Sequence, residues 1–500
     1  MLFRKYGTKR YAMATYPEWV TAHRQKGTEI RFINGQYYVY TVTSKWNPEK
    51  KRAQKITGKL IGKITPAGFV ESSKEKLRKQ IAGKNDFSKV VVKEYGLTQF
   101  LETQFADVIQ KIKLYFPNEW QVILVGIYSR LAFQAPLKQI AFHYGHSFLS
   151  QRYPSLILND KDYSLMLREI GRDRTRLSEF MRSFVQAGEH ILVDLTHMPL
   201  KSEQIPLSKA GYNSQMDYNP QYNALYVYSL DLKMPVFYRI VPGNIREVKA
   251  IQLTLQEARI KDCVLIADKG FYAKNNIQAL QENGLQYIIP LRRNNSLIDT
   301  AELKRDKIKS GSRYFTHEKR IIWYSSYTTE ENQTVYCFLD PVLEVKEEQD
   351  YISRIEQQQE DYSIEHYHER KHKFGTISII TNLKKKTAQE IYTTYKSRGE
   401  IESMFDLFKN VLEADKSYMQ NEDTLQGWIF VNHLALLAVY KIYHILQDKK
   451  LISKYSIRDF IQHLLEIRAV KINDSWHTAE IIHATGKFLE KIGIECKPIP

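Results

Sequence analysis

The sequence predicts an α/β fold, and three observations lead to that prediction. Across residues 189–298, short apolar segments typical of buried strands alternate with segments of helical spacing. Two of the apolar segments end at an acid, Asp194 in the first and Asp268 in a later one. A third acid, Glu402, lies on a helical segment farther along the chain. Because strand ends form the ligand-binding crevice of an open α/β sheet, we expect the two aspartates to face one site.

The overall composition favours a nucleic-acid partner. The 500 residues include 73 Lys and Arg against 56 Asp and Glu, which gives a formal net charge of +17. A polyanion is the natural partner of such a chain, and no basic amphipathic segment points to a membrane surface instead. Polar residues interrupt the longest apolar run, 430–446, so we expect a buried helix there and no membrane span.

The cysteines and the first residues favour a reducing compartment. Cys263, Cys337 and Cys496 are too far apart in sequence for a zinc motif or a disulfide framework. The first ten residues, MLFRKYGTKR, lack the apolar stretch of a secretory signal. We therefore expect a cytoplasmic protein.

Residues 1–75 are expected to form a small β-rich module. Strand-like segments at 29–33 and 37–43 flank Asn34-Gly35, the strongest short hairpin signal. A second turn near 47–51 leads into a strand-like segment that ends at Ile64. Cations and aromatic residues alternate along this second hairpin: Lys45, Lys50, Lys51, Arg52, Lys55, Lys59 and Lys63, with Tyr37, Tyr38, Tyr40 and Trp46. Two interpretations stay open, a clamp on a DNA end and a solvated sheet edge protected by lysines.

Residues 76–188 are expected to form a helical region. Helical apolar spacing covers 101–115, 119–133, 137–144 and 163–185. Five arginines make the last of these segments basic: Arg168, Arg172, Arg174, Arg176 and Arg182. DNA binding is one interpretation, although no feature of the sequence selects a helix that would enter a groove.

Residues 189–298 have the element order of a ribonuclease-H-like α/β core, namely strand, strand, strand, helix, strand, helix, strand. A β-rich insertion over 299–375 is predicted to interrupt this core, and its segment 344–361 is acidic and prone to form a helix. The second part of the core, 376–445, carries the third acid. Residues 446–500 are predicted to be a helical C-terminal tail.

Residues 387–412 are predicted to form one helix. Thr387 and Glu390 have the spacing of a capping box, which marks a helix start. At about 100° per residue, four polar side chains share one stripe: Tyr395, Arg398, Glu402 and Lys409. Four apolar residues form the adjacent side, which we expect to be buried: Ile401, Met404, Phe405 and Phe408. Glu400 points away from the stripe.

The polar stripe would ordinarily be a solvated face, but its spacing is specific. Its pattern Y-(2)-R-(3)-E-(6)-K resembles the signature around the third catalytic acid in one branch of the DDE transposases of bacterial insertion sequences. VDLTH at 193–197 and ADKGFY at 267–272 resemble the blocks around the first and second acids of the same branch. The resemblance runs in order over most of residues 190–440.

The resemblance implies an enzyme that cuts the ends of a DNA element and joins them to target DNA. Its catalytic acids would be Asp194, Asp268 and Glu402, which would also hold two Mg²⁺ ions. Mg²⁺ prefers oxygen ligands, and two ions about 4 Å apart stabilise the attacking and leaving oxygens. By resemblance, Asp194 would bridge the ions, Asp268 would hold one and Glu402 the other. Mn²⁺ is expected to substitute.

The resemblance also implies the partners. They are double-stranded DNA, both the terminal inverted repeats of the element and the target, and a second copy of the chain in a synaptic complex. Three residues would bind the DNA phosphates beside the cleaved bond: Tyr395, Arg398 and Lys409. Arg398 would do so with two parallel hydrogen bonds from its guanidinium. The expected location is the bacterial cytoplasm, in association with the nucleoid.

Other candidate residues each have an ordinary interpretation as well. Trp323 either stacks on an extruded base or fills the core of the insertion. Three basic residues lie near predicted strand ends: Arg292, Arg293 and Lys269. Each of them either contacts DNA or is an ordinary solvated side chain. His197 near the site is expected to be a hydrogen-bonded structural residue.

Two alternatives to a transposase stay open. One is a ribonuclease-H-like nuclease without strand transfer, which would give no joined products in an assay with labelled DNA ends. The other is a transposase-derived DNA-binding protein whose acids are no longer used.

Overall fold

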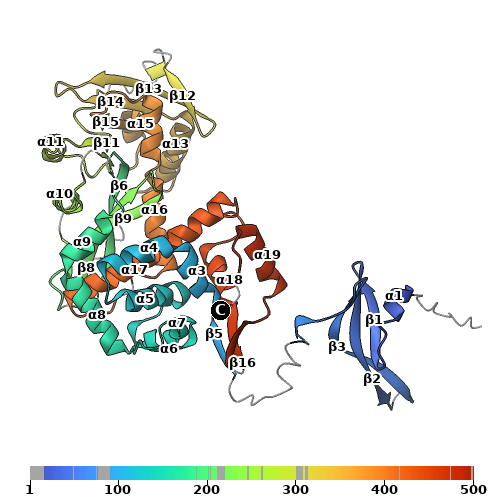
Figure 1. Ribbon diagram of the computed structural model, residues 1–500. Helices are drawn as coiled ribbons and strands as arrows, with labels where there is room; N and C mark the ends of the chain where they lie inside the picture. The colour runs from blue at the N-terminus through green and yellow to red at the C-terminus, as the bar shows by residue number, and fades with distance from the viewer. Residues whose placement is uncertain are drawn as a thin grey trace, which may run out of the picture. The chain divides into compact units, whose positions relative to one another are not determined.

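The computed structural model divides the chain into two compact units (Figure 1). Unit 1 comprises residues 1–93, 468–482 and 497–500, and unit 2 comprises residues 94–467 and 483–496. The structure describes residues 16–48, 50–74, 76, 90–186, 188–200, 202, 204–210, 220–244, 247–260, 263–299, 308–309, 313–415, 417–472, 474–496 and 499. The first ten residues, on which the expectation about a secretory signal depends, lie outside the described residues.

Unit 1 contains a four-stranded antiparallel sheet in the order β1-β2-β3-β4. Its strands are β1 (Thr28–Ile33), β2 (Gln36–Asn47), β3 (Arg52–Thr65) and β4 (Gly68–Glu71). Asn34 and Gly35 have φ angles of 49° and 78°, as a two-residue hairpin turn requires, so the predicted hairpin is confirmed. The small core of the module, beside helix α1 (Glu18–Thr21), consists of Val20, Ile30, Val39 and Ile64.

The C-terminal region 446–500 is predicted to be helical, and this prediction is wrong in part. Helices α18 (Ile457–Leu465) and α19 (His483–Ile492) are present, but a hairpin of β16 (Arg468–Ile472) and β17 (Ser475–Thr478) lies between them in sequence. The hairpin completes a three-stranded sheet, β17-β16-β5, with β5 (Val91–Glu94). Asp474 near the turn has a φ of 69°, a conformation that Asp tolerates in turns and that does not continue a helix.

The helices of residues 96–182 pack against one another and against the long helix α17 (Glu422–Asp448). They are α3 (Gly96–Gln104), α4 (Ala106–Tyr115), α5 (Trp120–Phe133), η2 (Leu137–Gln139), α6 (Ile140–His146), α7 (Leu149–Arg152), α8 (Asp160–Arg172) and α9 (Arg174–Arg182). The predicted continuous helix over 163–185 is wrong. Asp173 separates α8 from α9, because its side chain accepts a hydrogen bond from the Arg176 backbone N–H and caps α9.

Helix α17 is long and apolar enough to cross a membrane by length and composition alone, yet 78% of its most apolar window is buried inside the protein. It crosses α8 closely at two glycines, Gly171 and Gly427. A Cβ on Gly427 would lie 2.0 Å from the carbonyl oxygen of Leu167. α17 is therefore the buried core helix that the sequence predicts.

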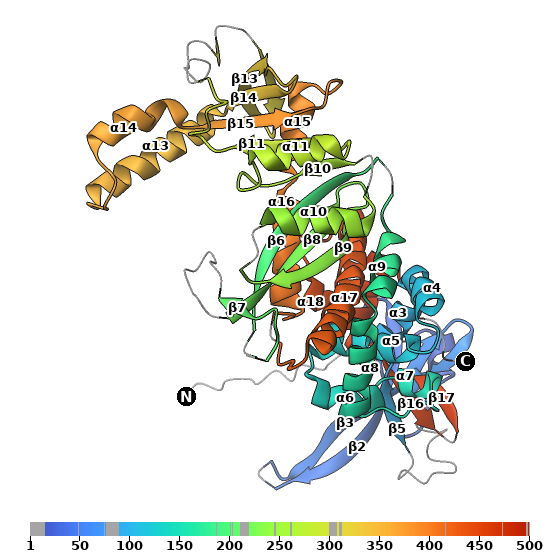
Figure 2. The ribbon, with the colours of Figure 1, turned by 90° about the vertical axis from the view of Figure 1, so that its left-hand side faces the viewer.

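The α/β core is built on a mixed sheet in the order β9-β8-β6-β10-β11. Its strands are β6 (His190–Pro199), β8 (Pro220–Ser229), β9 (Met234–Pro242), β10 (Val264–Ile266) and β11 (Gln286–Leu291). β8 is antiparallel to β6 and β9, whereas β10 is parallel to β6 and β11. Helix α10 (Glu247–Ala258) lies across β8 and β9, and α11 (Lys274–Glu282) joins β10 to β11 (Figure 2). This order of strands and helices confirms the predicted α/β core; a short strand, β7 (Lys209–Ala210), also pairs with β8.

The β-rich insertion continues the core sheet. Strand β15 (Thr376–Thr381) pairs with β11 on one side and with β14 on the other, so the sheet runs on as β11-β15-β14-β13-β12. The insertion contributes β12 (Tyr314–His317), β13 (Arg320–Thr328), β14 (Thr334–Leu339), α13 (Pro341–Glu356), α14 (Ile364–Arg370) and η3 (Lys371–Lys373). The acidic segment predicted to be helical corresponds to α13, whose N-cap, Asp340, accepts hydrogen bonds from two backbone N–H groups.

Candidate active site

The segment predicted as one helix over 387–412 is instead divided into three parts. They are α15 (Ala388–Lys396), α16 (Gly399–Asp406) and a π-helical turn, η4 (Leu407–Val411). The predicted capping box of Thr387 and Glu390 is present. At the break, the Ser397 hydroxyl donates to the Thr393 carbonyl oxygen at 3.1 Å, a contact that often bends helices.

The apolar side of α16 is buried as predicted. Ile401, Met404 and Phe408 are fully buried, and Phe405 is half-buried beside the ring of Tyr226 on β8. Glu400 points toward different neighbours, because its charge acts on Tyr228 and Tyr440. Of the two glutamates on α16, Glu402 is therefore the one that faces the strands carrying the aspartates.

Strand pairing brings the two aspartates to one place. Asp194 is predicted to follow a strand, but it lies within β6, which continues to Pro199 because its second half pairs with β8. The neighbouring strand β10 is shorter and pairs Ile266 with Leu192. Continuing this parallel register by two residues sets Asp268 opposite Asp194. β6 is thus uncovered on its β10 side where the first acid lies.

Arg398 contacts all three predicted acids. Its guanidinium nitrogens lie 3.3 Å from Asp194 Oδ2, 3.8 Å from Asp268 Oδ1 and 2.9 Å from Glu402 Oε1. The sequence places Arg398 on the same stripe as Glu402, but it predicts a contact with phosphate and gives no sign of these ion pairs. Residues far apart in the chain are therefore gathered around a single guanidinium.

The electrostatics of the cluster reflect its crowding. Burial raises the pKa of Asp194, the charges of Asp268 and Glu402 raise it further, and Arg398 partly offsets both effects. Burial works against the charged form of Arg398, but the carboxylates around it hold its pKa above the ordinary value. Like charges held this close favour a bound cation.

The chemistry of the cluster fits a divalent cation. Its donor set consists of carboxylate oxygens, the hard ligands that Mg²⁺ and Mn²⁺ prefer. Within the residues that the structure describes, no three His, Cys, Asp or Glu side chains stand in a geometry that could hold a metal ion. The three acids point at Arg398 instead, so the guanidinium takes the place of a cation among them.

Two other members of the motif have different surroundings. Burial raises the pKa of the Tyr395 phenol, and the nearby charge of Arg398 lowers it. Lys409 lies on η4, where burial lowers its pKa and the charge of Asp415 opposes that effect. No ion pair joins Lys409 to the three acids among the described residues, since the break and the π-turn change the helical phase assumed for the stripe.

Arg292 and Arg293 line a cavity of about 540 Å³ that also contacts Tyr395. Arg292 is exposed, whereas Arg293 is paired with Glu347 at 2.7 Å. Lys269 and Lys396 line the same cavity. Sequence reasoning did not select Lys396, although its position directly after Tyr395 in the motif was a usable signal.

Trp323 and His197 lie on strands of the same large sheet. Trp323 on β13 is half-buried, and its ring is 5.3 Å from that of Tyr314 on β12. Base stacking and packing within the insertion both remain predictions for it. His197 Nδ1 lies 2.8 Å from Asn223 Oδ1 on β8, which supports its structural interpretation.

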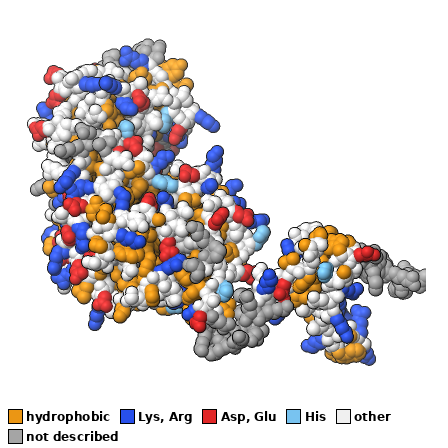
Figure 3. Space-filling view, viewed as in Figure 1, with side chains coloured by type: hydrophobic (Ala, Val, Ile, Leu, Met, Phe, Trp, Pro, Cys, Tyr) orange, Lys and Arg blue, Asp and Glu red, His pale blue; other side chains and the backbone are white. Residues whose placement is uncertain are grey.

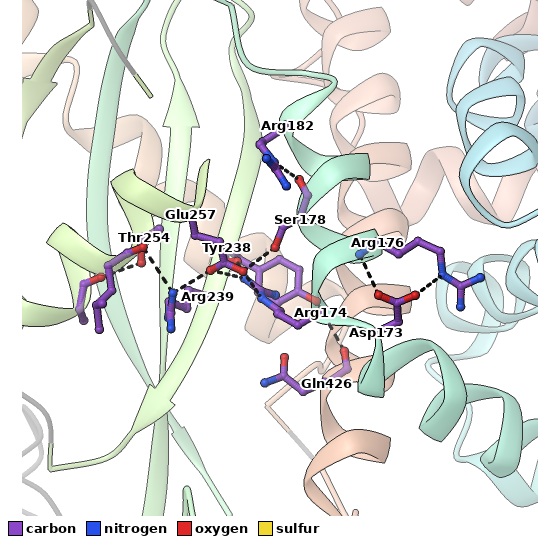
Figure 4. Close-up of polar contacts among 12 residues, drawn as sticks. Asp173, Arg174, Arg176, Ser178, Arg182, Tyr238, Arg239, Thr254, Glu257 and Gln426 are labelled. Atoms are coloured by element: carbon purple, nitrogen blue, oxygen red, sulfur yellow. Dashed lines mark hydrogen bonds and ion pairs between the residues drawn. The ribbon is translucent and has the colours of Figure 1, made fainter. Parts of the chain in front are cut away.

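Several arginines of the basic helical region are occupied by contacts within unit 2. Figure 4 shows Glu257 of α10 between Arg174 of α9 and Arg239 of β9. Burial raises the pKa of Glu257, but its hydrogen bonds with Arg174 and the charge of Arg239 outweigh burial and hold it below the ordinary value. Arg176 pairs with Asp173. These contacts give the arginines a structural role, so their presence is no evidence for DNA binding.

Comparison with known proteins gives one family and one structural likeness. A family model described as "Transposase DDE domain" matches residues 186–438. Comparison with curated protein sequences finds no match. Among solved structures, the cryo-EM structure of a piggyBac transposase synaptic complex with hairpin DNA has a TM-score of 0.40 and 9% sequence identity, over 69% of each chain. A likeness at that level carries no argument here. The family model covers half of the chain and contains all three acids, and the chain therefore belongs to the DDE transposase family.

Proposed function

We propose that the protein is the DNA transposase of a bacterial insertion sequence, which cuts the ends of its element and joins them to target DNA. The DDE transposases are nucleic-acid-cleaving enzymes that use divalent metal ions. The observation that carries the proposal is the meeting of Asp194, Asp268 and Glu402 around one guanidinium. The net positive charge of +17 suits a protein that binds duplex DNA.

The three acids would hold two Mg²⁺ ions, for which Mn²⁺ substitutes. Such ions stabilise the charge that builds on the attacking and leaving oxygens of a phosphodiester. Asp194 is the central ligand in this proposal, since it lies within strand β6 and the charges of both other acids act on it. Asp268 and Glu402 would each complete one side of the site.

The cations around the acids would position the DNA backbone. Arg398 has a buried Nε donor without a hydrogen-bond partner among the described residues, and a phosphate oxygen would satisfy it. Tyr395 is close enough to the guanidinium for the charge of Arg398 to act on its phenol, so it would face the same phosphate. Arg292 and Lys269 on the neighbouring cavity extend the positive surface away from the acids. Lys409, Arg293 and Trp323 remain candidates for DNA contacts farther from the three acids.

A strand-transfer assay tests the proposal. Labelled duplexes from both flanks of the coding region are incubated with the protein, Mg²⁺ and a target plasmid. We expect joined products from the wild type and none from Asp194→Asn, Asp268→Asn or Glu402→Gln, while Glu400→Gln on the same helix stays active. Cleavage without joining would favour a nuclease. Binding with no cleavage in any metal would favour a transposase-derived DNA-binding protein.

Two further parts of the proposal concern assembly and location. A pair of element ends requires two active sites, so a homodimer is proposed for the synaptic complex. The protein would act in the bacterial cytoplasm, at the nucleoid. Sedimentation of the protein with and without paired element ends tests the first point.

A further inference from the structure

The β2–β3 hairpin extends beyond the sheet of unit 1. β1 pairs with β2 no farther than Thr41, and β4 pairs with β3 only from Gly62 onward. Residues 42–47 and 52–57 therefore pair only with each other among the described strands. We call these twelve residues the ribbon. Each of them is exposed or half-buried, and a two-stranded hairpin of this kind is marginally stable by itself.

The register assigns the ribbon's side chains to two faces. Residues directly opposite each other share a face. The first face carries Thr43, Lys45, Asn47, Arg52, Gln54 and Ile56. The second face is attached to β1, because Lys55 pairs with Glu29 at 3.2 Å and Arg31 donates to the Thr57 hydroxyl at 2.6 Å. Trp46 leaves the outer part of the second face exposed as well, but the first face has no hydrogen bond or ion pair with β1 among the described residues.

The first face combines charge with amide groups. Lys45 and Arg52 have no ion pair among the described residues. Asn47 Nδ2 donates to Gln54 Oε1 at 3.0 Å, and Asn47 Oδ1 accepts from the Lys50 backbone N–H at 3.1 Å. Lys50 and Lys51 at the turn are exposed. Figure 3 shows Lys and Arg side chains gathered over the part of this module formed by β2 and β3. Charge complementarity selects a polyanion as the occupant.

We propose that the first face of the ribbon reads base edges in the major groove of duplex DNA. This inference rests on the proposed function, and it adds the element that recognises the DNA sequence. The major groove admits a two-stranded β-ribbon. There Arg and Lys pair with guanine, and Asn and Gln pair with adenine. Lys50 and Lys51, at the tip, contact the flanking phosphates. The Asn47 and Gln54 amides also have partners within the ribbon, and base contacts would exchange these hydrogen bonds for bonds to adenine.

Selection from a duplex pool tests the proposal with the full chain. The pool contains duplexes with about 20 random base pairs, a length that covers two turns of the double helix. We expect the wild type to enrich one sequence. The double variant Asn47→Ala/Gln54→Ala should lose about tenfold or more of its preference for that sequence over an unrelated duplex, since each base contact contributes discrimination. The affinity of this variant for the unrelated duplex should stay within about twofold of the wild type, because affinity for DNA of any sequence comes from phosphate contacts.

A second double variant separates phosphate contacts from base contacts. Lys50→Gln/Lys51→Gln should keep the preference but reduce the slope of log affinity against log salt by about 2. Lys454→Gln, an exposed lysine of unit 2, is the control and should change neither quantity. Circular dichroism confirms that each variant is folded.

The outcomes distinguish this inference from the proposed function. If Asn47→Ala/Gln54→Ala discriminates as the wild type does, while the wild type cuts and joins DNA, the ribbon does not read bases and only this inference fails. If the wild type binds no duplex and cuts none, the proposed function fails with it. Loss of preference in the Lys454 control would also overturn the assignment, because the effect would not be specific to the ribbon.

Discussion

Replacing Arg398 with methionine removes the positive charge that contacts all three acids. The Asp194 side chain is 17% exposed and lies 3.3 Å from Arg398. Removing one partner of a buried ion pair costs about 3–5 kcal/mol. The Glu402 side chain is 60% exposed, and an exposed pair contributes only about 0–1 kcal/mol. We therefore expect metal-free Arg398→Met to lose about 3 kcal/mol of its free energy of unfolding, at the lower end of the buried range.

The same substitution is expected to strengthen the binding of Mn²⁺. In the wild type the Arg398 guanidinium is already paired with the carboxylate oxygens that a divalent cation would bind, so the two cations compete. Without this competitor the dissociation constant for Mn²⁺ should fall at least about tenfold, which corresponds to about 1.4 kcal/mol, less than half of the lost ion-pair energy. Isothermal titration calorimetry without DNA measures the affinity, and thermal unfolding with and without Mn²⁺ measures the recovered stability.

Lys409→Met is the matched control for this experiment. It removes a cation from the same motif, but one that interacts with Asp415 and not with the three acids. Mn²⁺ affinity in the control should equal that of the wild type. If Arg398→Met binds Mn²⁺ no more tightly than the wild type does, the guanidinium and the metal do not compete for the same oxygens, and the reasoning is refuted.

Three further predictions concern stability. Gly427→Ala should lower the free energy of unfolding by about 2–3 kcal/mol, because the added Cβ meets the Leu167 carbonyl oxygen at the α8–α17 crossing; thermal unfolding measures the loss, and a variant as stable as the wild type contradicts it. Glu257→Gln should cost about 3 kcal/mol in urea unfolding, because it leaves Arg174 without its carboxylate; a loss below about 0.5 kcal/mol would mean that the pair is not important for the fold. Burial raises the pKa of Glu94 from 4.5 to about 7, so the folded state binds this proton more tightly than the unfolded state does. The free energy of unfolding should consequently fall by about 3 kcal/mol as the pH rises through that interval, and urea unfolding of Glu94→Gln should lack this fall.

Local signals predicted most of the elements that build the site. The Asn34-Gly35 turn, the Thr387 capping box and the apolar face of α16 depend on residues within a few positions of one another, and all three are present. The α/β core was predictable for the same reason, because its buried strands are short apolar runs.

The sequence did not predict two kinds of feature: pairings between distant strands, and small local deviations from helical geometry. β6 continues past Asp194 because β8 supplies its partner, which no local pattern reveals. The hairpin of β16 and β17 is stabilised through β5, more than 370 positions earlier in the chain. The break after Lys396 and the π-turn at Lys409 are small deviations from helical geometry. A prediction that assumes 100° of rotation per residue throughout cannot detect them.

The insertion is better understood as a support for the third acid than as an interruption of the core. β15 joins β11, the strand after the second acid, to β14 of the insertion, and α15 follows β15 directly. Tyr392 on α15 packs its ring against Phe315 of β12 and Phe338 of β14, at centroid distances of 5.4 and 4.9 Å. α15 is thus held by the insertion just before the break that turns Arg398 and α16 toward β6. Because Glu402 is on the helix after that break, its position relative to Asp194 depends on the aromatic packing of Tyr392 inside the insertion.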